Sequence, residues 1–118
     1  MTKEITTLTS EEISLLKKNH RPLFFNNDFD LIYESQIPNM GIILLEGELK
    51  LVKKKKILDS LPQGAMVGIR NIINNLPLPV GVKIYKNSSI LMIEKSEIME
   101  ALANKTGLLY QIITAFNR

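Results

Sequence analysis

Few side chains of this chain are of the kinds that carry out nucleophilic, acid–base or metal chemistry. The 118 residues include no cysteine, which excludes thiolate nucleophiles, disulfides and thiolate metal sites. His20 is the single histidine, so it cannot provide a multi-histidine metal site, and its place beside Arg21 is typical of a helix end. The sequence therefore predicts no catalytic residue, no metal and no cofactor, and we expect the protein not to be an enzyme.

The stretch 64–82 has the composition of a binding loop. Gly64 and Gly68 permit turns, a short apolar helix follows at about 69–73, and two prolines stiffen the loop before a new strand begins. A short helix whose first N–H groups face a loop can hold an anion. Arg70 is the one charged residue of the stretch, and a helix that starts at Gly68 turns this side chain away from the loop.

This stretch resembles the phosphate-binding cassette of the cyclic nucleotide-binding domain family, the ligand module of catabolite-activator-type regulators and cyclic-nucleotide-dependent kinases. The family pattern is Phe-Gly-Glu followed, after a short helix, by Arg-Ala-Ala-x-Val. Aligned without a gap, the first motif falls on Val67, Gly68 and Ile69, and the second falls on Leu78, Pro79, Val80, Gly81 and Val82. A second local match is the aliphatic strand and Gly-Glu turn at 41–50.

The two ligand-binding side chains of the family are missing here. In the family the Glu holds the ribose hydroxyl and the Arg pairs with the cyclic phosphate, whereas this chain has Ile69 and Leu78 at those positions. Their loss weakens nucleotide binding by about 3 kcal/mol or more, roughly a hundredfold. The resemblance therefore implies a degenerate pocket at Gly68, Ile69, Arg70, Leu78, Pro79, Val80 and Gly81, with Ile69, Leu78 and Val80 filling the space. We expect no cyclic nucleotide to bind in the usual way. The alternative is a sensor that takes a cyclic nucleotide or another effector in the β-roll.

The elements around this loop indicate a single domain over 1–118. The capping-box sequence from Thr9 to Glu12 predicts an N-terminal helix at about 10–18. Short strands and turns follow at about 21–94, and Ser96 is the expected N-cap of C-terminal helices at about 96–116. The predicted fold class is mainly β with flanking helices, and the resemblance implies a double-sheet, cupin-like jelly roll. The chain ends where family regulators continue into a helix-turn-helix, so we expect no DNA-binding domain in it.

The charge pattern bears on location and on one hairpin. Residues 1–9 lack the apolar core of a signal peptide, and no apolar run approaches the about 20 residues of a membrane span. We therefore expect a cytoplasmic protein without a membrane segment. Lys53–Lys56 separates two strand-like runs and predicts a hairpin with a basic tip. A contact with nucleic acid or an acidic surface is one interpretation, and a solvated tip that blunts a sheet edge is the favoured one.

The last helix carries a broad apolar stripe made of Leu108, Leu109, Ile112, Ile113 and Phe116. Such a stripe can pack back on its own roll or pair with a second copy. In the family the helix after the roll often dimerises, and we expect a homodimer through this helix. Together these features predict a non-catalytic regulatory or scaffolding module that acts through a protein partner, whose identity the sequence does not give.

Overall fold

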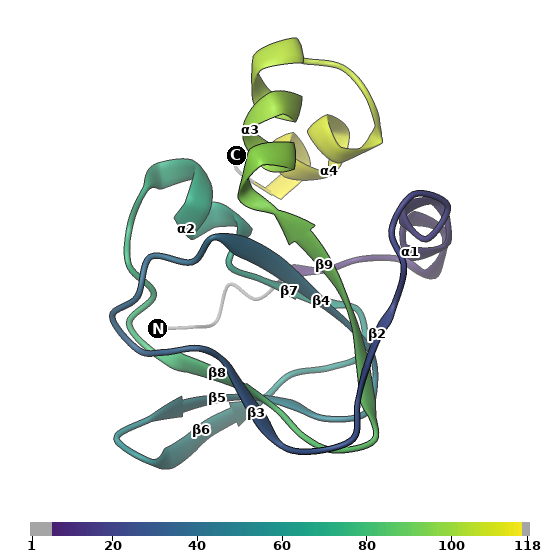
Figure 1. Cartoon of the computed structure of the whole chain (residues 1–118). Helices are drawn as coiled ribbons and strands as arrows, with labels where there is room; N and C mark the ends of the chain where they lie inside the picture. Colours follow the sequence, from purple (N-terminus) through teal and green to yellow (C-terminus); the bar gives the residue numbers. More distant parts are fainter. Residues whose placement is uncertain (1–5, 117–118) are drawn as a thin grey trace.

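The computed structural model describes the backbone of residues 6–116 and the side chains of residues 6–114. Two antiparallel sheets face each other, and helices flank them (Figure 1). In spatial order, the five-stranded sheet contains β1 (Thr6–Thr7), β7 (Ala65–Val67), β4 (Met40–Glu46), β9 (Ser88–Glu94) and β2 (Leu23–Phe25). The four-stranded sheet contains β3 (Phe29–Ile32), β8 (Gly81–Ile84), β5 (Leu49–Lys53) and β6 (Lys56–Ser60). The predicted fold class, a mainly β double-sheet roll with flanking helices, is confirmed.

The helices are α1 (Ser10–Leu16), α2 (Ile69–Asn74), α3 (Lys95–Asn104) and α4 (Leu108–Phe116). At the start of α1 the predicted capping box is present: the Glu12 N–H donates to Thr9 Oγ1 over 3.1 Å, and the Thr9 N–H donates to Glu12 Oε1 over 2.9 Å. The predicted N-cap of α3, Ser96, is wrong by two residues. Its N-cap is Glu94, in extended conformation and without a side-chain cap, because β9 runs directly into the helix.

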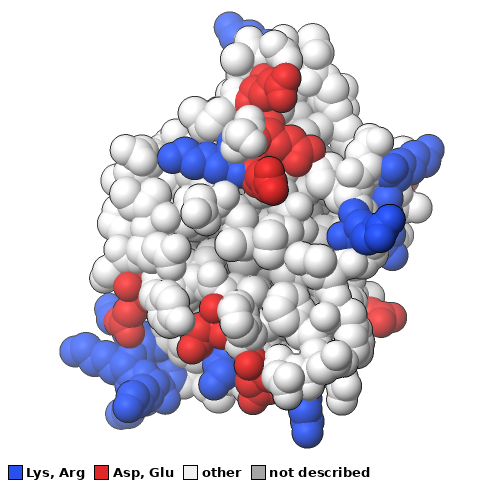
Figure 2. Space-filling view, viewed as in Figure 1, with Lys and Arg blue, Asp and Glu red and all other residues white. Residues whose placement is uncertain are grey.

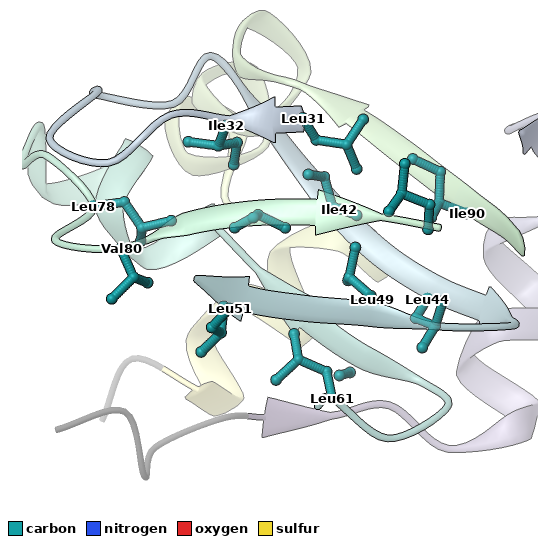
Figure 3. Close-up of a cluster of buried hydrophobic side chains, with 13 residues drawn as sticks. Leu31, Ile32, Ile42, Leu44, Leu49, Leu51, Leu61, Leu78, Val80 and Ile90 are labelled. Atoms are coloured by element: carbon teal, nitrogen blue, oxygen red, sulfur yellow. The ribbon is translucent and has the colours of Figure 1, made fainter. Parts of the chain in front are cut away.

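A first hydrophobic cluster fills the space between the two sheets. Alternate residues of paired strands point the same way, so Ile42 and Leu44 of one sheet meet Leu49 and Leu51 of the other. Figure 3 shows this cluster, which consists of Leu31, Ile32, Ile42, Leu44, Leu49, Leu51, Leu61, Ala65, Leu78, Val80, Val82, Ile84 and Ile90. Every one of these buried side chains is aliphatic. We call this set the roll cluster.

A second hydrophobic cluster lies on the opposite face of the five-stranded sheet, beneath the helices. It uses the other set of alternating strand residues, including Ile43, Leu91 and Ile93, and it takes helical residues that include Ile98. We call this set the helix cluster.

In the part of the chain that the structure describes, no helix is both long and apolar enough to span a membrane.

The second local match, at 41–50, forms the corner between the two sheets. Gly47 has φ +98°, and a Cβ on it would overlap Ser88, so only glycine fits. The buried Ser88 hydroxyl accepts a hydrogen bond from the Glu48 N–H over 2.8 Å, which satisfies a backbone donor at the corner. Gly47 therefore allows a close backbone approach to Ser88 at this corner.

Candidate functional site

The site begins at a sharp turn between β7 and α2. Gly68 has φ +97°, and a Cβ built on it would lie 3.0 Å from the Met40 carbonyl oxygen. A residue with a side chain would therefore be strained both in its backbone and against β4. The C-cap of the short helix α2 is Asn75, which is also left-handed, with φ 54°. This is the turn, short helix and loop that the sequence predicts.

Hydrogen bonds then hold the loop from α2 to β8 in place. The Leu78 N–H donates to the Gln36 carbonyl over 2.9 Å, and the Leu78 carbonyl accepts from the Ser35 N–H over 2.7 Å. Asn71 Nδ2 donates to the Pro77 carbonyl over 3.0 Å, which ties the loop back to α2. Both the backbone N–H and the backbone carbonyl of Leu78 are thus hydrogen-bonded to the segment that follows β3. This backbone bonding fixes the direction of its side chain.

Leu78 and Val80 lie in the interior of the roll. They are 8% and 6% exposed and belong to the roll cluster. Figure 3 shows both at one end of that cluster, where the chain enters β8. An anion placed among these side chains would lose its hydration and gain no charged partner from the cluster. The position aligned with the phosphate-binding Arg of the family is therefore part of a hydrophobic core.

No protein-family model and no curated protein sequence matches this chain. Solved structures do match. One comes from a study of a cyclic-GMP-dependent signalling pathway in bacterial phytopathogenesis, with a TM-score of 0.73, 13% identity, and coverage of 93% of this chain and 91% of that one. The chain has the cyclic nucleotide-binding fold.

Two larger proteins contain the same fold in part of their length. The catabolite activator protein of Thermus thermophilus matches with a TM-score of 0.66 and 15% identity, over 92% of this chain and 53% of that one. The cyclic-AMP-bound PfPKA-R matches with a TM-score of 0.63 and 15% identity, over 92% of this chain and 39% of that one. This chain thus spans about half or less of these two proteins.

Within this cyclic nucleotide-binding fold, Ile69 does not lie where the sequence suggested. It is 3% exposed and belongs to the helix cluster, on the other side of the five-stranded sheet from Leu78. Its side chain packs so closely over Gly41 that a Cβ on that glycine would overlap it. The expectation that Ile69 fills the roll is wrong, because the first residue of α2 faces the helical layer.

The remaining cassette positions are split between surface and core. Arg70 and Pro79 are exposed. Gly81 is buried, and a Cβ on it would lie 3.2 Å from both the Ile32 carbonyl oxygen and Val52 Cγ2, so neighbouring strands approach closely there. Of the cassette residues, the structure therefore brings Leu78, Val80 and Val82 into the roll cluster.

The apolar stripe of α4 is largely used within the protomer. Ile112 and Ile113 are 2% and 1% exposed and belong to the helix cluster. Leu108 and Leu109 are half-buried against the same cluster. The side chain of Phe116 lies outside the described residues. Of the predicted interface, Leu108 and Leu109 are thus the described side chains that keep accessible surface.

One side-chain pair was not foreseen from the sequence. His20 Nδ1 lies 2.8 Å from the Leu16 carbonyl oxygen, as befits a helix-end residue, and His20 Nε2 lies 2.6 Å from Glu97 Oε2. The pair stands in a groove of about 260 Å³ between α1 and the α3–α4 corner, whose lining includes Leu15 and Leu108. Glu97 is 77 positions away in sequence, so no local pattern could have revealed this contact.

Proposed function

We propose that this domain is a non-catalytic regulatory or scaffolding module that acts by contact with a protein partner and does not bind a cyclic nucleotide in the usual way. The observation that carries the proposal is the burial of Leu78 in the roll cluster. The cyclic nucleotide-binding fold supports a regulatory role, and the missing acidic and basic ligand residues argue against the usual ligand.

The roll cluster offers no charged partner for a cyclic phosphate. A cyclic phosphate needs a partner for its negative charge, and a hydrogen bond to a charged group contributes about 1.5–3 kcal/mol. At the end of the roll where Leu78 and Val80 lie, the roll cluster offers aliphatic side chains. A nucleotide would have to displace this packing as well as forgo its ion pair. Both effects oppose binding.

The proposal includes a homodimer. Because two residues of the α4 stripe are buried within the protomer, the remaining residues must make the contact with the second copy. Since Ile112 and Ile113 are enclosed in the protomer, we assign the contact to the surface formed by Leu108, Leu109 and the exposed Leu15 across the groove. These residues come from two helices that face the same groove. Leu15 is 37% exposed and Leu108 and Leu109 keep part of their surface, so a partner that covers them would bury apolar area.

A thermal-shift series tests the absence of the usual ligand. The protein is heated with cyclic AMP, cyclic GMP and cyclic dinucleotides at millimolar concentration, and we expect no rise in melting temperature. A ligand present at about 1,000 times its dissociation constant stabilises the folded state by roughly 4 kcal/mol, so binding would be plain. A clear rise with any of these nucleotides would overturn the proposal in favour of a small-molecule sensor.

A further inference from the structure

The hairpin of β5 and β6 concentrates positive charge. Residues 49–60 hold five of the chain's 15 Lys and Arg residues and a single acidic residue, Asp59. Lys53–Lys56 are all exposed. Figure 2 shows blue side chains gathered at the lower left, where Figure 1 places the free end of this hairpin. The tip is therefore a compact cationic surface.

The turn itself does not call for lysine. Lys53 pairs with Lys56, and the two residues between them, Lys54 and Lys55, have φ 51° and 67°. A two-residue turn with both φ values positive favours Asn-Gly, because side chains with a Cβ are strained there. The Lys54 N–H donates to Glu34 Oε1 over 3.0 Å, so the tip is also held against the segment after β3. Backbone geometry therefore does not account for lysine at these two positions.

Edge protection accounts for only part of the cluster. β6 is an edge strand of the four-stranded sheet and is exposed along its whole length, and a lysine on such a strand discourages pairing with another chain. This explains Lys56. It does not explain Lys54 and Lys55, which lie in the turn, beyond the ladder. Nor does it explain why Ile57 and Leu58, next to the lysines, are 55% and 50% exposed.

We propose that the β5–β6 hairpin docks the protein on an anionic membrane surface. A cluster of lysines is drawn to the negative potential of anionic lipids, and apolar side chains beside it gain by entering the headgroup region. Ile57 and Leu58 supply that apolar component. Phosphates of a nucleic acid would make no use of these two side chains, and residues 49–60 contain no aromatic side chain for base stacking.

The lysines of the hairpin tip would orient such docking. Figure 2 shows acidic side chains at the top, over α3, and also among the basic side chains of the lower half of this face. The orientation therefore follows from the local concentration of lysine at the tip and not from a difference in charge between the two ends of the molecule. The groove beside α3 would face away from the membrane, toward other proteins. This docking is independent of what the roll binds.

Sedimentation with lipid vesicles tests the proposal. The full chain is mixed with vesicles of phosphatidylcholine containing about 30% phosphatidylserine, or of phosphatidylcholine alone, at about 0.1 M and 0.5 M salt. We expect binding to the anionic vesicles at low salt only. Lys54→Asn with Lys55→Gly removes two charges and suits the turn, so we expect about thirtyfold weaker binding without a fall in melting temperature. Ile57→Ser with Leu58→Ser is expected to weaken binding as well.

A matched control changes the net charge by the same amount at a different place in the fold. One double variant carries Lys54→Glu and Lys55→Glu in the hairpin. The control carries Lys17→Glu and Lys18→Glu at the exposed end of α1 and changes the net charge by the same amount. Only the hairpin variant is expected to lose vesicle binding. Equal losses in both variants, or no binding to anionic vesicles by the unaltered protein, would overturn the proposal. So would tighter binding to a DNA duplex that is lost in the hairpin variant, which would assign the hairpin to nucleic acid.

Discussion

His20 Nε2 lies 2.6 Å from Glu97 Oε2, and this contact joins the end of α1 to α3 across 77 residues of sequence. The His20 side chain is 12% exposed and the Glu97 side chain 42% exposed, so water screens the pair on the Glu97 side. The other ring nitrogen, Nδ1, is 2.8 Å from the Leu16 carbonyl. His20 thereby connects the N-terminal helix to the C-terminal helical layer.

Removing this contact is expected to lower stability modestly. His20→Ala should reduce the free energy of unfolding by about 1 kcal/mol, since a partly exposed charge-assisted bond and a helix-end contact are lost. Urea unfolding followed by circular dichroism measures the change. Glu97→Gln should have a smaller effect in the same direction, and Glu100→Gln, on the exposed face of α3, should stay within about 0.5 kcal/mol of the unaltered protein. Equal effects of all three would show that the contact is not specific.

Leu78→Arg tests the closure of the roll directly. This change restores the family's side chain at that position but places a charge among aliphatic neighbours, and we expect a loss of about 3 kcal/mol or more of unfolding free energy. Leu78→Met, which keeps the volume, should cost less than about 1.5 kcal/mol. Retained stability of the Arg variant, together with new cyclic nucleotide binding, would mean that the pocket remains open. Ile69→Glu is not a useful companion, because Ile69 lies in the helix cluster.

The sequence predicts local features of this fold better than it predicts which face a residue presents. The Thr9–Glu12 capping box and the left-handed glycine at 68 depend on neighbouring residues, and both are present. The side of the sheet that Ile69 faces depends on how α2 crosses β4, which only the tertiary structure sets. The amphipathic stripe of α4 shows that something must cover it. The stripe alone does not show whether the covering surface belongs to the same protomer or to a second copy.

The burial of Ile112 predicts a large effect from truncation. Ile112→Ala removes a side chain that is 2% exposed in the helix cluster, and such changes cost about 2–5 kcal/mol. Thermal and urea unfolding should both shift strongly. Leu15→Ala, at a residue that is 37% exposed, should cost far less and serves as the matched control. A small effect at Ile112 would mean that α4 is not packed on its own protomer.

The proposed homodimer predicts a mass of two protomers and predicts which substitutions separate them. Light scattering at high protein concentration should give about twice the protomer mass of 13.4 kDa. Leu108→Ser with Leu109→Ser should return the mass to one protomer, because these side chains are only half-buried and keep surface for a partner. Some loss of stability is expected too, since both residues touch the helix cluster, so circular dichroism must show a folded protein. Ile57→Ser with Leu58→Ser, on the distant hairpin, should leave the dimer intact. A single-protomer mass for the unaltered protein would contradict the dimer and leave Leu108 and Leu109 as a surface for a different partner.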